Sequence, residues 1–196
     1  ASAFAEGRPA ASYALIDWIA GRQKATPPPP NIPQGAPDRM TTEFSVFSPA
    51  ARQRLEAHLA AGGKLFLSGA HIAEDLTAGP LAGAASREFA QKALGVAGYT
   101  APATRLRAVR PQTGAGAFSD LDNFRFGRDF DETIYPVVSC EAFQPAPGGA
   151  AQPALQYADT GLCAALAGPQ VALLGFPLET VLPAGARAKL LAAALE

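Results

Sequence analysis

Hydrophobic residues gather in three short runs that predict buried strands. The runs cover residues 13–19, 64–67 and 171–176. Largely uninterrupted apolar runs of this length are typical of strands that are buried on both faces, as in a parallel sheet. We therefore expect strand 64–67 to be central in a parallel sheet, with strands 13–19 and 171–176 on its two sides.

Helix signals separate these runs. Ser48 can cap exposed backbone amides and Pro49 suits the first helical position, so a helix is predicted from here to the glycine pair at 62–63. Its His58 is expected at the boundary of the helix rather than as a ligand. Further helices are predicted at residues 86–94 and after Pro183.

The chain becomes richer in strand signals after residue 133. Segments 154–157 and 162–166 flank Asp159-Thr160-Gly161, a pattern that predicts a β-hairpin. Together with the helices and the apolar runs, this predicts an α/β fold in one domain over residues 1–196, with a β-rich C-terminal insertion. The segment 27–40, which begins with four consecutive prolines, is expected to be exposed and less ordered than its neighbours.

Composition excludes several classes of partner. The net charge of the 196 residues is -1, so nothing attracts a nucleic acid backbone, and no apolar run is long enough to span a membrane. The aspartates among the aromatic residues at 118–131 lack an EF-hand spacing, so we predict no metal site and no cofactor. Cys140 and Cys163 are too few for a disulfide framework; they are either small buried apolar residues or, in a secreted protein, a pair.

Candidate chemistry lies where two of the predicted strands end. Ligands of open α/β sheets bind at the carboxyl ends of the strands, and Ser68 and Glu179 follow the second and third runs, with His71 in the loop between them. Ser68 would bind or attack a substrate, and Glu179 would act as a general base or orient His71. No nucleophile–base hydrogen bond from Ser68 to His71 is expected, because Ala70 between them lacks the conformational freedom of glycine. The binding candidates around these residues are Gly69, Glu74, Asp75, Asp17 and Trp18.

Each carboxylate in this set also has a structural interpretation. Glu74 and Asp75 suit the first turn of a helix, where negative charge complements the helix dipole. Glu179 suits a charged cap on the loop that follows the third run. Asp17 interrupts the first run, and a position at the strand end, where it caps a loop, would avoid the cost of burying it.

Three stretches of the sequence resemble a known family. "YALIDWIAG", "LEAHLAAGGKLFLSGAHIAEDL" and "QVALLGFPLETV" occur in the same order in a domain of large secreted bacterial proteins that carry the names xanthan lyase or N-acetylmuramoyl-L-alanine amidase. That domain is similar to the class I glutamine amidotransferase-like superfamily, and the resemblance covers about residues 13–181. It implies a three-layer flavodoxin-like parallel sheet, a secreted or cell-surface location, and as partners a polysaccharide or cell-wall glycan and other domains of the same parent protein.

The chain departs from this family in two ways. Such a fold opens with a βα unit, but residues 1–11 contain no strand signal, so this unit is expected to be lacking or to be supplied by a separate segment. The family's enzymes place a cysteine at the turn after a central strand and a His-Pro-Glu motif after the last strand. Here Ser68 stands at the turn, and Phe176-Pro177-Leu178-Glu179 lacks the histidine, so the glutaminase triad is not present.

These departures lead to three functional interpretations. The first is an accessory or catalytically degenerate amidotransferase-like domain of a secreted protein related to carbohydrates or the cell wall. The second is a hydrolase or lyase that acts on a polysaccharide or peptidoglycan at the carboxyl ends of the strands. The third is a carbohydrate-binding module that presents exposed aromatic side chains, with the candidates Trp18, Tyr99, Phe118, Phe124 and Tyr135.

Overall fold

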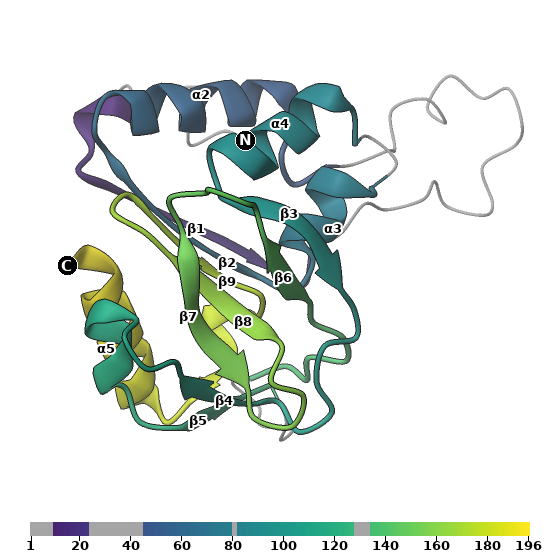
Figure 1. The fold of residues 1–196 in the computed structure, drawn as a ribbon, viewed down its shortest axis with the longest axis vertical. Helices are drawn as coiled ribbons and strands as arrows, with labels where there is room; N and C mark the ends of the chain where they lie inside the picture. The colour runs from purple at the N-terminus through teal and green to yellow at the C-terminus, as the bar shows by residue number, and fades with distance from the viewer. Residues whose placement is uncertain (1–9, 24–44, 80–81, 128–133) are drawn as a thin grey trace, which may run out of the picture.

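The computed structural model describes residues 10–23, 45–79, 82–127 and 134–196, which form a mixed α/β fold (Figure 1). The helices are η1 (Ala10–Ser12), α2 (Pro49–Ala60), α3 (Ile72–Thr77), α4 (Ala84–Lys92), η3 (Gly116–Asp120), η4 (Leu178–Thr180) and α5 (Ala184–Leu195). The strands are β1 (Leu15–Gly21), β2 (Lys64–Gly69), β3 (Val96–Thr100), β4 (Ala108–Pro111), β5 (Phe124–Phe126), β6 (Ala142–Pro145), β7 (Gln152–Tyr157), β8 (Cys163–Ala167), β9 (Val171–Leu174) and β10 (Val181–Leu182). Strands β3 and β6 form a separate antiparallel pair.

The main sheet contains the predicted parallel core. Its eight strands follow the order β1-β2-β9-β8-β7-β4-β5-β10, and β2 pairs in parallel with both β1 and β9. The register places Leu65 of β2 between Ile16 of β1 and Val171 of β9. The prediction for these three strands is therefore confirmed.

The sheet as a whole is mixed rather than parallel, which corrects the expectation of a parallel sheet. Strand β8 is antiparallel to β9, and β7 is antiparallel to β8. Only residues 168–170 connect β8 to β9, and a connection this short can join only antiparallel neighbours, because a parallel pair needs a crossover. The β-rich part of the chain extends the sheet beyond its parallel core, and the predicted hairpin of β7 and β8 is confirmed.

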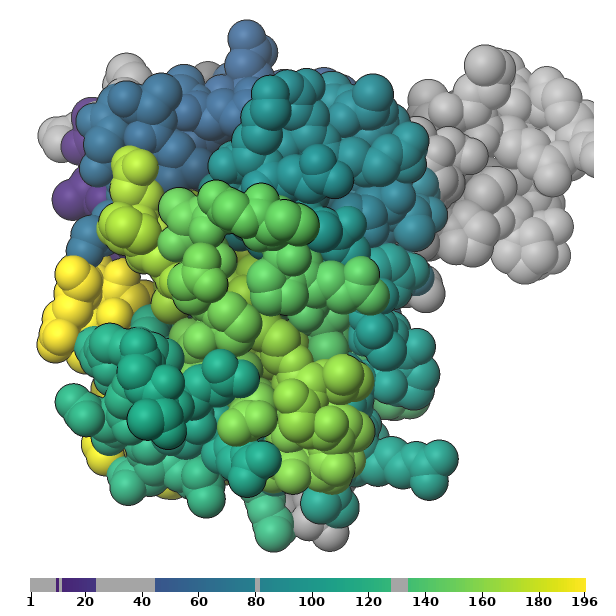
Figure 2. All heavy atoms as spheres, viewed as in Figure 1, coloured from purple at the N-terminus to yellow at the C-terminus, as the bar shows by residue number. Residues whose placement is uncertain are grey.

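Side chains of β2 alternate between two hydrophobic clusters on opposite faces of the sheet. Phe66 packs in the cluster that contains Leu190 of α5, whereas Leu65 and Leu67 pack in the cluster that contains Phe89 of α4. Figure 1 shows α2, α3 and α4 together at one side of the parallel strands and α5 at the other. In the space-filling view, the segments that form α2 and α4 lie side by side at one end, and the segments after residue 134 cover much of the face below them (Figure 2).

The start and end of α2 follow the predicted signals. The Ser48 side chain accepts a hydrogen bond from the backbone N–H of Ala51, and Pro49 is the first helical residue. His58 is fully buried, with ring nitrogens 3.0 Å from the carbonyl of Ala10 and 2.8 Å from that of Lys64, so it is a core residue and not the expected boundary residue. It ties α2 to the beginning of β2, because two backbone carbonyls satisfy its polar ring.

Other expectations have simple outcomes. The segment 27–40 lies outside the described residues. Cys140 and Cys163 are free thiols, and burial raises the pKa of both. Within the described ranges, the search for a helix that is long and apolar enough to cross the lipid bilayer finds none.

Candidate functional site

Ser68 is the fifth residue of β2, so the strand extends beyond the expected end at residue 67 and Ser68 does not stand at a turn. Ser68 is fully buried, and its Oγ has no hydrogen-bond partner among the described residues. Gly69 follows where the chain passes β1: a Cβ here would lie 2.8 Å from the Cβ of Ala20 and 3.4 Å from Ile72. Glycine is therefore required by close packing. Among the residues that the structure describes, no base forms a hydrogen bond with the buried hydroxyl of Ser68 to activate it.

His71 is directed toward its own helix rather than toward Ser68. It occupies the N-cap position of α3, and its Nδ1 lies 2.6 Å from Oε2 of Glu74. Glu74 and Asp75 stand in the first turn of this helix, as their structural interpretation predicted. The pair of His71 and Glu74 is nevertheless partly accessible, with side chains 12% and 28% exposed.

A buried acidic residue that sequence reasoning missed, Glu141, caps the N-terminus of α3. Glu141 is fully buried, and its carboxylate accepts hydrogen bonds from the backbone N–H groups of Ala73 (2.7 Å) and Glu74 (3.0 Å). It satisfies the amides at a helix start where no side chain of the helix itself acts as a cap. Burial raises the pKa of Glu141 to about 8, and the backbone N–H groups oppose this rise.

The segment around Glu141 is held by a second buried polar group. The Tyr157 hydroxyl donates to the Glu141 carbonyl at 2.7 Å and lies 3.2 Å from the carbonyl of Gly175. Gly175 follows β9, and a Cβ at that position would lie 2.3 Å from the Glu141 carbonyl oxygen. Glu141 is thus fixed between α3 and the end of β9, and burial raises the pKa of Tyr157 well above its ordinary value.

Glu179 lies at the carboxyl end of β1, beside Gly21, which pairs with Gly69 of β2. Its Oε1 accepts a hydrogen bond of 2.5 Å from the Tyr135 hydroxyl, and its Oε2 is buried without a described partner. A Cβ on Gly21, the last residue of β1, would lie 3.1 Å from Glu179 Oε1. The Arg22 guanidinium stacks over the Tyr135 ring at 4.7 Å. At the carboxyl end of β1, Glu179, Tyr135 and Arg22 therefore form one cluster of polar and charged side chains.

Asp17 lies in the same strand, β1, close enough to Glu179 for their charges to interact, but it is not at the end of the strand. It is the third residue of β1, and its side chain is exposed, which corrects the expectation of a loop cap. The exposure is possible because β1 is the outermost strand of the sheet that the structure describes. Partial burial, and after it the nearby Glu179 carboxylate, raises the pKa of Asp17, so the two carboxylates interact.

Two other candidates serve the core. Trp18 faces the opposite side of the sheet from Asp17 and stacks on Phe47, with ring centroids 5.8 Å apart. Asp75 is buried and accepts hydrogen bonds from the Ser45 hydroxyl (2.8 Å) and the Phe47 amide (3.2 Å). Both residues therefore hold the segment before α2 against the sheet and α3.

The aromatic candidates do not form an exposed platform. Phe118 and Phe124 are buried in the cluster on the α5 side, and Tyr99 packs against the other cluster. Tyr135 is half-buried and bound to Glu179, and Trp18 is partly buried and stacks on Phe47. Because aromatic platforms for sugars need accessible ring faces, these five residues do not favour the carbohydrate-binding interpretation.

The chain offers no metal centre among its described residues, where no three His, Cys, Asp or Glu side chains gather closely enough to hold an ion. Comparison of the chain with protein-family models, curated proteins and solved structures finds no match.

Proposed function

We propose that the chain is an accessory, catalytically degenerate domain with a glutamine amidotransferase-like, flavodoxin-like ancestry, and that it serves a secreted bacterial protein related to carbohydrates or the cell wall. The observation that carries the proposal is the carboxyl end of β2. In the enzymes of that superfamily a nucleophile stands at the turn after the corresponding strand. Here Ser68 lies within β2, is buried and has no base among the described residues, since His71 pairs with Glu74.

The start of α3 supports the same proposal. A helix N-terminus after such a turn is suited to bind an anionic ligand group or a developing negative charge. In this chain the Glu141 carboxylate already takes the N–H groups of Ala73 and Glu74. A substrate oxyanion would have to displace a buried side chain, so the position that would do chemistry is filled by the protein itself.

The test combines a turnover screen with covalent labelling. The chain and its Ser68→Ala variant are incubated with glutamine, with a panel of polysaccharides and with peptidoglycan, and a serine-directed phosphonate is applied in parallel. We expect no turnover and no labelling of Ser68. Turnover that disappears in Ser68→Ala, together with a phosphonate adduct on Ser68, would overturn the proposal.

The accessory role has its own test in the parent protein. Removing residues 13–181 from the full-length protein is expected to change its activity or its localisation. If both stay unchanged, the domain has no accessory role in that protein, whatever the outcome of the turnover screen.

One observation favours a second function, the cleavage of a polysaccharide or peptidoglycan by a hydrolase or a lyase at the carboxyl ends of the strands. Asp17 has a raised pKa beside Glu179, and such a pair can divide the roles of acid and base. In that case Asp17→Asn and Glu179→Gln would each lower turnover at least 100-fold, while Ser68→Ala would not. Absence of turnover on every polysaccharide, or full activity in Glu179→Gln, would exclude this function.

The outer edge of β1 supports a partner within the parent protein. No described strand pairs with the outer side of β1, and Ile19 in this strand and Tyr13 shortly before it are 52% and 48% exposed. An unpaired edge with apolar side chains is suited to receive further secondary structure. We therefore assign this edge to contact with another domain of the parent protein.

A further inference from the structure

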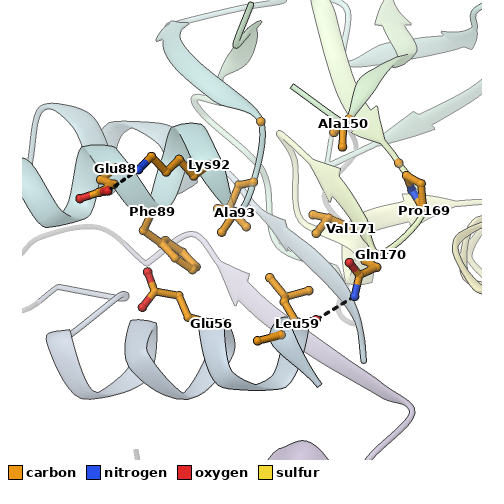
Figure 3. A pocket seen from close by; sticks show the side chains of 15 residues that line it. Glu56, Leu59, Glu88, Phe89, Lys92, Ala93, Ala150, Pro169, Gln170 and Val171 are labelled. Atoms are coloured by element: carbon orange, nitrogen blue, oxygen red, sulfur yellow. Dashed lines mark hydrogen bonds and ion pairs between the residues drawn. The ribbon is translucent and has the colours of Figure 1, made fainter. Parts of the chain in front are cut away.

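A pocket opens at the end of the sheet opposite to Ser68. It has a volume of about 460 Å³ and lies between α2, α4 and the turn that joins β8 to β9 (Figure 3). Val171, the first residue of β9, lines it, so the pocket lies at the amino ends of the parallel strands. Its volume falls within the range of about 300 to 1,000 Å³ that is typical of small-molecule sites.

The floor of the pocket is apolar. Phe89, Leu94 and Val171 line it and are buried in the core that holds α2 and α4 against the sheet. Figure 3 shows Phe89 and Ala93 of α4 facing Leu59 of α2 across the hollow. A ligand that fills this space would remove further apolar surface from water, which favours a hydrocarbon body.

The charged groups at the rim leave one negative charge uncompensated. Glu88 and Lys92 pair with each other at 2.7 Å and are both exposed. Glu56 extends from α2 beside Phe89, and none of the described residues forms a hydrogen bond or ion pair with its carboxylate (Figure 3). The rim therefore offers a free carboxylate next to an apolar floor.

Two helix ends add to this negative potential. Leu59 and Ala60, at the end of α2, and Lys92 and Ala93, at the end of α4, all line the pocket. The C-terminus of a helix carries the negative end of its dipole and favours cations. Gln170 fixes the geometry, because its amide nitrogen donates to the carbonyls of Leu59 (2.8 Å) and Gly63 (3.2 Å).

We propose that this pocket binds a small organic amine, with a primary ammonium group at Glu56 and an alkyl or aryl body on the floor formed by Phe89, Leu94 and Val171. The carboxylate and the two helix C-termini select the positive charge, and the apolar floor selects the hydrocarbon. The site is independent of the carboxyl-end edge at Ser68 and Glu179, and it requires no catalytic activity.

The test is a titration of the ¹⁵N-labelled chain followed by NMR. The probes are n-hexylammonium, 1-hexanol and hexanoate, which share a body and differ in charge. For hexylammonium we expect a Kd on the order of 1 mM and chemical-shift changes that centre on the amides of Leu59, Phe89, Ala93 and Gln170. Hexanol should bind about threefold to tenfold more weakly, because it lacks the charge, and hexanoate should not bind detectably.

Two variants and one control make the test specific. Glu56→Gln should weaken hexylammonium binding about threefold to tenfold, and Ala93→Phe, which fills the hollow, should abolish it while the far-UV circular dichroism stays unchanged. Asp120→Asn removes an exposed charge from η3, outside this pocket, and should leave binding unchanged. Equal binding of hexylammonium and hexanol, equal binding by Glu56→Gln, or shifts that centre elsewhere would each overturn the proposal.

Discussion

Glu141 allows a sharp test of how burial competes with backbone hydrogen bonds. Its carboxyl group is fully buried, and its pKa of about 8 compares with an ordinary value of 4.5. The folded protein therefore keeps a proton on Glu141 over a pH range in which the unfolded chain has released it. The folded state binds more protons between these two pH values, so the stability that this group contributes is complete below pH 4.5 and is lost as the pH rises to about 8.

The size of the effect follows from the two pKa values. Each pH unit between them corresponds to about 1.4 kcal/mol of unfolding free energy, so the whole window amounts to about 5 kcal/mol. Between pH 5 and pH 8 the loss is about 4 kcal/mol. Such a loss is large relative to the total stability of about 5 to 15 kcal/mol that is typical of a domain.

The perturbation is Glu141→Gln, which keeps the shape of the side chain and one acceptor for the amides of α3 but does not titrate. Urea unfolding of both proteins is followed by the fluorescence of Trp18, the single tryptophan, at several pH values from 5 to 8.5. The wild-type minus variant difference in unfolding free energy cancels the titration of other groups. We expect this difference to decrease by about 4 kcal/mol from pH 5 to pH 8.

Two results would refute the reasoning. A difference that does not change with pH would mean that Glu141 has the same pKa in the folded and unfolded chain. A difference that increases with pH would mean that the N–H groups of Ala73 and Glu74 outweigh burial and hold the group ionised, since carboxylates with several such donors can have very low pKa values.

Three further predictions concern stability and use the same unfolding assay. Gly63→Ala should cost about 2 to 4 kcal/mol, because the new Cβ would lie 2.1 Å from the buried ring of His58. Gly185→Ala in α5 has open space around the new Cβ and should be neutral or stabilising. Equal effects of the two substitutions on stability would contradict the predicted clash with His58. Tyr135→Phe should cost about 1 to 2 kcal/mol, because it leaves both oxygens of Glu179 without a described partner, while Tyr13→Phe at the surface should change stability by less than about 0.5 kcal/mol. Ser68→Ala should be neutral or stabilising, because it removes a buried hydroxyl without a described partner. Thr180→Val removes the hydrogen bond to the Pro177 carbonyl and should cost about 1 kcal/mol. A large loss of stability in Ser68→Ala would show that its hydroxyl has a partner.

The features that sequence reasoning predicted correctly depend on local patterns. The apolar runs that became β1, β2 and β9 and the capping residues of α2 are written in neighbouring positions, so their periodicity and chemistry are visible in the chain. The mixed character of the sheet was missed because the three residues between β8 and β9 were not treated as a reversal. A stricter use of connection length could have found it.

The candidate site was harder to predict because its contacts span long stretches of sequence. Glu141 caps a helix 68 residues earlier, and Tyr135 reaches Glu179 across 44 residues. No local spacing marks such a pair. Asp17 and Glu179 were both named as candidates, yet their proximity depends on the segment after β9 crossing to the end of β1, which only the tertiary structure determines.

The two ends of the parallel strands offer different candidate sites in this chain. Ligands of open α/β sheets normally bind in the crevice outside the carboxyl ends of the strands. In this chain several groups at that end bind one another: Glu141 takes the amides of α3, His71 pairs with Glu74, and Tyr135 donates to Glu179. Ser68 Oγ and Glu179 Oε2 stay without a described partner. The amino ends instead border an open, largely apolar pocket with an unpaired carboxylate. The amine titration tests the amino-end pocket, and the turnover screen with Ser68→Ala tests the carboxyl end, so the two experiments together distinguish the two ends of the sheet.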